Sequence, residues 1–291
     1  MRALTQSELS AFGKCERYHQ LRYLKRLRPM LQGLPLRFGT AFHLGIEHGN
    51  PQAAGQFVRK GLERAFIQED RQRVEIAAGQ VESMVRGAIK AWSGSEQPSE
   101  REVEFCVPLI NPETGRPSRR HRLGGKVDGV GADRTYEYKT TSRLDRDYID
   151  RLEVDQQVDT YQDAMSRVLG RRIRQSVYRV ALKVSIRVRK NESVPEYLRR
   201  VEEEYQTKPE RYFHEEIVDR SDDQIELWRK DAWEKHLRIL SNESGGHAPR
   251  NANSCVGRFG RCEFLDLCSG AVTEAAYRVD EQIHPELGGK E

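Results

Sequence analysis

The stretch LGGKVDGV-GADR-TYEYKT, residues 123–140, decides the fold of this chain. Residues 121–130 and 135–140 have the pattern of two β-strands, and the glycine-containing segment 131–134 between them is typical of a tight turn. Strands joined by so short a turn pair as antiparallel neighbours, so side chains on the same face lie close together. The sequence therefore predicts a β-hairpin at residues 121–140.

Three functional groups fall on this hairpin. Glu137 and Lys139 are two residues apart, so they share one face of their strand, whereas Tyr138 points to the other. Asp128 lies near the end of the preceding strand, so an Asp, a Glu and a Lys are expected to converge. Two carboxylates can bind a divalent cation that polarises a phosphodiester, and a neighbouring lysine can orient water or stabilise charge. On spacing alone, an ordinary salt-bridge ladder is the alternative.

The segments around the hairpin indicate an α/β sheet. Residues 103–109 alternate as a strand before it, and residues 154–169 after it repeat at helical spacing and stop at Gly170. Another strand is expected over residues 176–186. A meander followed by a helical crossover gives a sheet with helices on its faces.

The remaining elements are mostly helical. A capping box of Thr5 and Glu8 begins the first helix. The other expected elements are helices over about 38–47, over two segments between 51 and 92, near 194–206 and from Ser221 to about 240, and a short strand at 213–218.

The composition excludes fibrous, low-complexity and membrane classes. The chain has 291 residues, 37% hydrophobic and 32% charged, and no window reaches the roughly 18 continuous apolar residues of a membrane helix. No secretory signal is visible at the N-terminus, so we expect a cytoplasmic protein with no membrane partner. Five cysteines in such a chain are expected to be thiols or metal ligands rather than disulfides.

The formal net charge of +4 conceals two strongly basic segments. Residues 167–190 hold nine Arg or Lys and no acid, and residues 14–37 hold seven against the single acid Glu16. Basic strips suit a polyanion, because side chains that neutralise phosphates release counterions; a solvated face is the ordinary alternative. We expect parts of both segments to line a groove for DNA.

Two further motifs bear on the same site. His43 follows Gly39 by one helical turn, where a helix can approach the sheet and present an imidazole to a metal. Gln157 and Tyr161 are four residues apart on one helix face, and both can hydrogen-bond a phosphate. His43 and Glu47 have the same spacing and could themselves chelate a metal, although a packed or exposed role for both is the ordinary alternative.

The chain resembles the RecB-type nucleases of the PD-(D/E)XK superfamily over about residues 5–270, through four motifs in the same order: Gly39 to His43, Asp128, Glu137-Tyr138-Lys139, and Gln157 to Tyr161. The resemblance implies a restriction-endonuclease-like core, a central mixed sheet flanked by helices. It also implies that Mg²⁺ or Mn²⁺ is bound by His43, Asp128, Glu137 and the carbonyl of Tyr138. Lys139 would orient water or stabilise charge, and Gln157 and Tyr161 would position DNA. An imidazole ligand favours Mn²⁺ over Mg²⁺.

We therefore expect one nuclease domain over residues 1–291. Its parts are a helical segment (1–100), the nuclease core (101–220), a C-terminal helix with a Cys-rich loop (221–270) and a tail (271–291). The tail is weakly patterned and carries no predicted element.

Four cysteines suggest a second metal centre. Cys255, Cys262 and Cys268 lie within one short loop, and Cys15 on the first helix is the natural fourth ligand, since Cys106 is expected to be a small buried hydrophobe inside a strand. Four thiolates suit Zn²⁺ or an iron–sulfur cluster. One N-terminal cysteine and a C-terminal triplet around such a core resemble the iron–sulfur nucleases of CRISPR adaptation and of bacterial helicase–nucleases. This resemblance implies a [4Fe–4S] cluster that clasps the first helix to the C-terminal loop.

The leading hypothesis is a Mg²⁺- or Mn²⁺-dependent DNA exonuclease that acts on single-stranded ends and carries a structural cluster. The second hypothesis is a catalytically inactive DNA-binding or scaffold protein stabilised by a four-cysteine zinc or iron–sulfur centre. The third is a redox sensor that uses the cluster.

Overall fold

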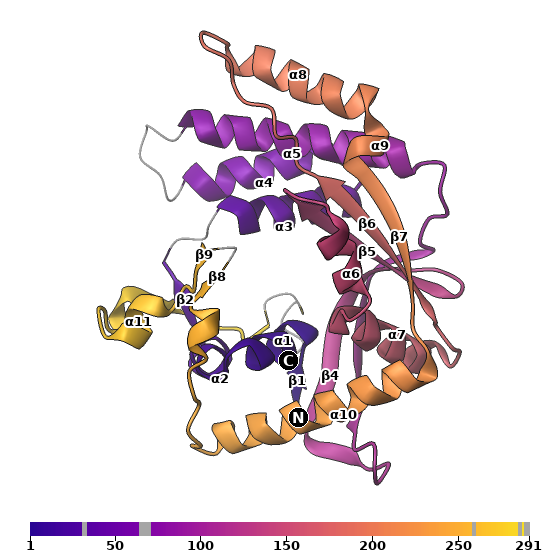
Figure 1. Ribbon diagram of the computed structural model, residues 1–291, viewed down its shortest axis with the longest axis vertical. Helices are drawn as coiled ribbons and strands as arrows, with labels where there is room; N and C mark the ends of the chain where they lie inside the picture. The colour runs from indigo at the N-terminus through magenta and orange to yellow at the C-terminus, as the bar shows by residue number, and fades with distance from the viewer. Residues whose placement is uncertain (31–33, 64–70, 258–259, 285–286, 288–291) are drawn as a thin grey trace.

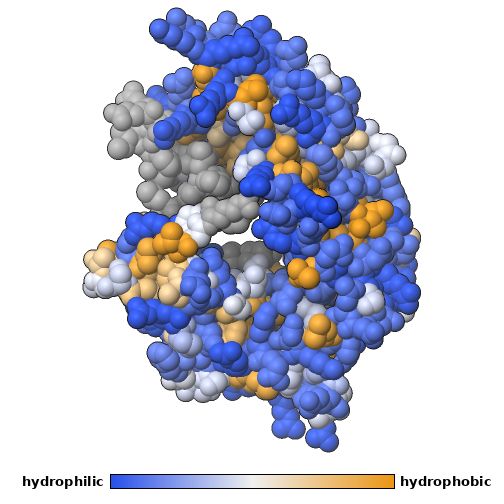
Figure 2. Space-filling view, in the orientation of Figure 1, coloured by the Kyte–Doolittle hydropathy of each residue, from blue (hydrophilic) through white to orange (hydrophobic). Residues whose placement is uncertain are grey.

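Figure 1 shows the computed structural model of the protein, which describes residues 1–30, 34–63, 71–257, 260–284 and 287. Parts of the expected helical segment, Cys-rich loop and tail fall outside these described residues, at 31–33, 64–70, 258–259, 285–286 and 288–291. Within the described ranges, every helix is too short or too polar to cross a membrane. The face drawn in Figure 2 is mainly hydrophilic, with scattered hydrophobic side chains.

A mixed sheet of six strands forms the centre of the described part of the chain. Strands β3 (Glu100–Ile110), β4 (Pro117–Val130) and β5 (Arg134–Thr141) pair antiparallel in succession, so the predicted meander is confirmed. Strand β6 (Gln175–Leu182) lies parallel to β5 after a helical crossover, and β7 (Phe213–Asp219) pairs antiparallel with β6. The predicted α/β class, a mixed sheet flanked by helices, is confirmed.

Strand β4 divides one of its edges between two partners. Strand β3 pairs along its other edge, whereas β1 (Arg2–Leu4) pairs in parallel with residues 121–123 and β5 pairs only with residues 129–130. No described strand pairs with this edge of β4 between residues 124 and 128. The edge therefore opens where β4 and β5 diverge, and Asp128 lies at this opening.

Helices cover both faces of the sheet (Figure 1). On one face lie α3 (Leu34–Glu47), α4 (Pro51–Glu63), α5 (Arg71–Trp92), α8 (Val194–Thr207) and the short α9 (Pro209–Tyr212). Their buried side chains, such as Phe42 and Met84, form one core with Tyr138 of β5. On the other face, α1 (Gln6–Lys14), α7 (Gln156–Leu169) and α10 (Asp222–Glu243) pack around Leu123 and Val127.

Local signals set several helix ends. Ser193 and Ser221 form capping boxes at the starts of α8 and α10, and α7 ends at Gly170, whose φ of 63° is left-handed. The Thr5 side chain accepts from the Glu8 amide as predicted. However, the Glu8 carboxylate does not complete the capping box and instead pairs with Arg2 and His19.

The two ends of the chain pack together beside the sheet. Short elements α2 (Glu16–His19), the π-helical turn η1 (Gln20–Leu24) and β2 (Leu27–Pro29) meet β10 (Tyr277–Val279), which pairs antiparallel with β2. Between α10 and β10 lie η3 (Ala252–Ser254), β8 (Val256–Gly257), β9 (Gly260–Arg261), α11 (Leu265–Ser269) and η4 (Glu274–Ala276). Phe264 is fully buried against Leu21 and Leu27. The described part of the tail is thus ordered by pairing with a distant segment, which no local pattern reveals.

Several elements of the main sheet and its helices also differ from the prediction. The strand predicted over 176–186 ends at Leu182, because its partner strand β7 begins opposite Ala181. Strand β1 is too short to show a periodic pattern. Helix α6 (Arg146–Leu152) was not predicted, although Asp145 caps it by accepting a hydrogen bond from the Tyr148 amide at 3.0 Å.

Candidate active site

Asp128 is held at the opening between β4 and β5. Its Oδ2 accepts a hydrogen bond of 2.8 Å from the backbone amide of Tyr138. The same oxygen lies 3.4 Å from Nδ1 of His43 on α3. The Asp128 side chain of β4 thus hydrogen-bonds to the backbone of β5 at the point where the backbone hydrogen bonds between these two strands have ended.

His43 reaches the site because α3 lies against β5. A Cβ atom added at Gly39 would lie 3.9 Å from Oγ1 of Thr140, so the helix passes close to the end of that strand. The His43 side chain is 32% exposed and forms its ion pair with Asp128. This contact joins the imidazole to the hairpin, and the alternative chelating pair with Glu47 stays a prediction.

Glu137 and Lys139 share one face of β5 and contact each other. The Lys139 ammonium donates to Oε1 of Glu137 and, at 3.0 Å, to Oε1 of Gln157 on α7. Gln157 Nε2 donates to the same Glu137 oxygen at 2.9 Å and to the Tyr161 hydroxyl at 3.1 Å. The two α7 residues that the sequence placed on one helix face therefore adjoin the acid and the lysine.

The second carboxylate oxygen of Glu137 stands out. Glu137 is only 4% exposed, and its Oε2 has no hydrogen-bond partner among the described residues. A buried carboxylate oxygen without a partner is costly, because burial removes its water. This oxygen is the natural place for a positively charged ligand.

The charges of the site shift one another's pKa values. Burial and the nearby charge of Asp128 raise the pKa of Glu137 to about 7. Burial opposes ionisation of Asp128, but its interactions with His43 outweigh this effect and lower its pKa. Burial also favours neutral His43 and Lys139, but the adjacent carboxylates outweigh it and raise both pKa values. Asp128 and Lys139 are therefore charged at neutral pH, whereas Glu137 titrates there.

The donor set fits a divalent metal, since it offers one imidazole and two carboxylates, one of which has the unpartnered Oε2 of Glu137. No group of three or more His, Cys, Asp or Glu side chains in the described ranges is already arranged around a metal position. The possible ligands instead contact other side chains and the backbone. Asp128 contacts His43 and the Tyr138 amide, and one oxygen of Glu137 accepts hydrogen bonds from Lys139 and Gln157. These side chains pair with one another and would have to turn toward a metal.

The comparisons with known proteins agree with this geometry. A model of the PD-(D/E)XK nuclease superfamily matches residues 3–269. The chain belongs to this superfamily. A crystal structure of a "Putative exonuclease" from Eubacterium rectale resembles this PD-(D/E)XK protein with a TM-score of 0.56 at 16% sequence identity, covering 99% of this chain and 94% of the other. At that identity the likeness concerns the fold. No curated protein matches the chain.

The four cysteines predicted to act together line one small cavity of this PD-(D/E)XK protein: Cys15, Cys255, Cys262 and Cys268. The Asn251 amide donates to Cys15 Sγ at 3.3 Å, and the Cys262 amide donates to the Cys255 carbonyl at 2.8 Å. The prediction for the fifth cysteine was wrong. Cys106 is exposed, because its buried neighbours on β3, such as Phe105, occupy the opposite face of the strand.

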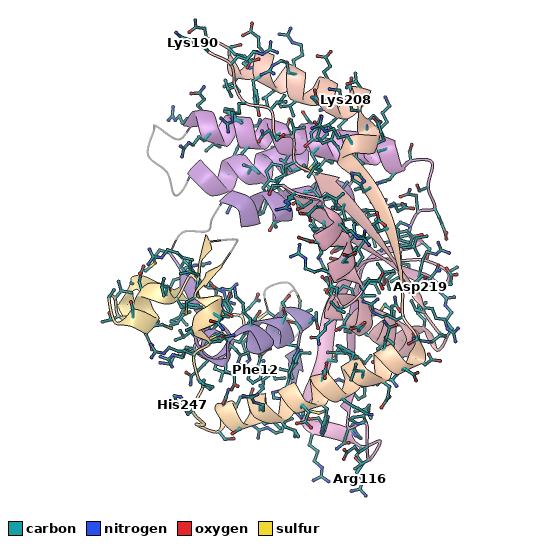
Figure 3. The ribbon with its side chains drawn as sticks, in the orientation of Figure 1. Phe12, Arg116, Lys190, Lys208, Asp219 and His247 are labelled. Atoms are coloured by element: carbon teal, nitrogen blue, oxygen red, sulfur yellow. The ribbon has the colours of Figure 1, made fainter. Side chains whose placement is uncertain are left out.

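Two arginines of the basic segments are held in internal contacts. Arg179 is only 1% exposed and binds Glu215 at 2.8 Å, and Arg28 is buried and pairs with Asp280. Lys190 lies at the outer edge of the molecule beside α8 (Figure 3). The part of segment 14–37 at residues 31–33 lies outside the described residues. These two charges are therefore used within the fold, and the groove lined by other parts of the two segments stays a prediction.

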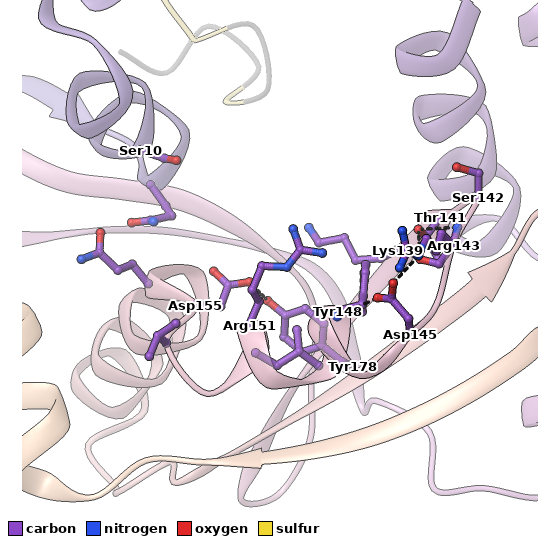
Figure 4. A pocket seen from close by; sticks show the side chains of 14 residues that line it. Ser10, Lys139, Thr141, Ser142, Arg143, Asp145, Tyr148, Arg151, Asp155 and Tyr178 are labelled. Atoms are coloured by element: carbon purple, nitrogen blue, oxygen red, sulfur yellow. Dashed lines mark hydrogen bonds and ion pairs between the residues drawn. The ribbon is translucent and has the colours of Figure 1, made fainter. Parts of the chain in front are cut away.

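The surroundings of Lys139 were not predicted from the sequence. A cavity of about 790 Å³ opens beside it, walled by α1, the segment after β5, α6 and the start of α7 (Figure 4). Tyr148 and Arg151 of α6 line this cavity. They are three residues apart after the capping residue Asp145, a spacing that could have indicated a short helix with both on one face.

Proposed function

We propose that this PD-(D/E)XK protein is a metal-dependent DNA exonuclease that acts on single-stranded ends. The observation that carries the proposal is the buried, unpartnered Oε2 of Glu137 beside Asp128, Lys139 and His43. A structural salt-bridge ladder would leave no such oxygen, because its carboxylates would be satisfied by the ladder itself.

Each residue then has a distinct role. His43, Asp128, Glu137 and the Tyr138 carbonyl would hold Mg²⁺ or Mn²⁺. When bound, the metal supplies polarisation of the phosphodiester and a lower pKa for an attacking water.

The surrounding side chains set the geometry of the reaction. Lys139 keeps its proton beside Glu137, so it can stabilise negative charge that develops on the phosphate. Gln157 contacts both Glu137 and Lys139 and is itself in contact with Tyr161, so it fixes their relative positions. The pair would also contribute hydrogen bonds to the DNA strand.

Activity and mode of cleavage can be tested together. We expect the protein with Mn²⁺ to degrade end-labelled linear single-stranded DNA and to leave circular single-stranded DNA intact. Asp128→Ala and Lys139→Ala should each slow degradation at least about 100-fold, since each removes charge stabilisation at the reacting phosphate. Asp133→Ala, an exposed carboxylate at the turn of the same hairpin, is the matched control and should cut normally. DNA binding without any cleavage would instead favour the inactive scaffold.

We also propose a structural [4Fe–4S] cluster at the four cysteines. A cluster binds each thiolate through a different iron, so its ligands lie farther apart than those of a single Zn²⁺ ion, the alternative occupant. The four thiols around one cavity are consistent with a shared centre there, and the choice of a cluster over zinc rests on the cysteine pattern of the sequence. A reducing cytoplasm, the compartment expected from the sequence, would keep these thiols available. A role in CRISPR adaptation is a hypothesis that rests on the cysteine pattern alone. Neither the description of the matching family nor that of the similar structure mentions such a role.

Iron and sulfide analysis tests the cluster directly. Cys262→Ala should lower the iron content and the visible absorbance of the purified protein and should destabilise the contact between the chain ends. Cys106→Ala removes a thiol outside the cavity and should leave both unchanged. Stoichiometric zinc without iron would contradict the cluster and identify the alternative.

A further inference from the structure

We propose that α6 forms a phosphate-binding subsite for the DNA strand, in which Arg151, supported by Tyr148, binds the phosphate next to the one that is cleaved. The inference rests on the proposed nuclease function and deepens it. It assigns a substrate contact to an element that lies outside all four nuclease motifs.

The cavity beside Lys139 connects this helix to the reaction centre. Its volume of about 790 Å³ is within the range of pockets that enclose small ligands. Lys139 lines one part of it, Arg151 and Tyr148 line another, and Ser10 of α1 faces them across the opening (Figure 4). Gln6 of the same helix also lines the cavity. A strand with one phosphate at Lys139 can therefore place a neighbouring nucleotide in this cavity.

The acids of the cavity are already engaged in structure. Asp145 caps α6 through the Tyr148 amide and forms an ion pair with Arg143. Asp155 caps α7 by accepting from the Gln157 amide at 2.9 Å, and its other oxygen accepts from the Tyr178 hydroxyl at 2.9 Å. Both carboxylates thus have partners other than Arg151, so neither of them occupies its guanidinium.

Arg151 differs from the other arginines of this region. Its Nε donates to the Asp147 carbonyl at 3.0 Å, and its guanidinium carbon lies 5.8 Å from the centre of the Tyr148 ring. No carboxylate among the described residues pairs with it. These contacts fix the plane of the guanidinium but leave its terminal nitrogens available, and a planar fork of this kind matches the oxygens of a phosphate.

Tyr148 links Arg151 to the reaction centre. Its phenol is half-buried, and its pKa is raised by burial, with Lys139, Asp155 and Glu137 among the charges that act on it. Tyr148 and Lys139 line the same cavity, and the Tyr148 ring contacts the Arg151 guanidinium, so the tyrosine lies near both cations. The ring can support the guanidinium through this cation–π contact, and Arg151 and Lys139 can each meet a different phosphate.

Arg146 provides a matched control on the same helix. It is 92% exposed, forms an ion pair with Asp150 at 3.6 Å and is absent from the lining of the cavity. Replacing it removes the same charge from α6 without touching the proposed subsite.

The test measures binding and cleavage separately. A fluorescent single-stranded oligonucleotide is titrated with the full-length protein in Ca²⁺, chosen as a metal that allows binding to be followed without turnover. Arg151→Ala should weaken binding about 10-fold and reduce the slope of log affinity against log salt by about 0.7, the loss of one phosphate contact on a single strand. Arg151→Lys should recover the slope but only part of the affinity, and Arg146→Ala should change neither.

Oligonucleotides with one neutral methylphosphonate linkage locate the contact. In the parent protein, a methylphosphonate at the linkage next to the cleaved bond should weaken binding as much as Arg151→Ala does. In the Arg151→Ala variant, the same methylphosphonate should not weaken binding any further. Equal sensitivity of parent and variant at every linkage would overturn the proposal, as would unchanged affinity and salt slope in Arg151→Ala. A parent protein that binds in this pattern but never cleaves would refute the nuclease function and leave the subsite standing.

Discussion

Glu137→Gln tests the central feature of the site, a buried carboxyl whose charge is unfavourable until a cation joins it. The pKa of Glu137 is raised from 4.5 to about 7, mainly by burial. A change of this size corresponds to about 3 kcal/mol between the protonated and ionised forms. The glutamine keeps the shape and the oxygen that accepts from Lys139, but it cannot ionise.

The direction of the effect follows from proton binding. Between pH 4.5 and about 7 the folded protein holds a proton on Glu137 that the unfolded chain has released. The stabilising contribution of Glu137 is therefore complete below pH 4.5 and is lost as the pH rises to about 7. In the absence of divalent metal, the free energy of unfolding of the parent should fall by up to about 3 kcal/mol across this window relative to Glu137→Gln.

Urea unfolding followed by fluorescence of the three tryptophans measures this difference at pH 5, 6, 7 and 8. Glu203→Gln on the exposed side of α8 is the control and should keep the pH dependence of the parent. Mn²⁺ should stabilise the parent more than Glu137→Gln, with an affinity that weakens about tenfold per pH unit below 7 because the ligand must first lose its proton. If parent and Glu137→Gln unfold with the same pH dependence, the pKa of Glu137 is not raised in the folded protein.

Two further predictions concern stability away from the active site. Phe264→Ala should destabilise the packed chain ends by about 3–5 kcal/mol, because Phe264 is fully buried and the centres of the Tyr18 and Tyr277 rings each lie 5.3 Å from that of its own ring. Thermal unfolding measures this loss, and a loss below about 1 kcal/mol would contradict the packing. Burial and nearby His121 lower the pKa of His236 to about 4, so stability should decline as the pH falls from about 6.5 to about 4. His236→Phe should flatten that decline in urea titrations, and an unaltered decline would show that another group is responsible.

The sequence by itself determined the parts of this protein that depend on neighbouring residues. The meander at residues 103–140, the long amphipathic helices and the shared face of Glu137 and Lys139 follow from periodicity within one element. The pairing of Gln157 with Tyr161 follows from helical spacing in the same way. Such patterns are local, because one turn or one strand already fixes which side chains lie together.

Only the tertiary structure decided how distant segments divide the edges of the sheet. The opening at Asp128 exists because β1 and β5 pair with separate parts of the β4 edge. Strand β1 is too short to be recognised from a periodic sequence pattern. The pairing of β2 with β10 and the contacts that bury Arg179 likewise join segments far apart in the chain. Their free energy comes from burial and hydrogen bonds between those segments, so no window of sequence contains the information that places them.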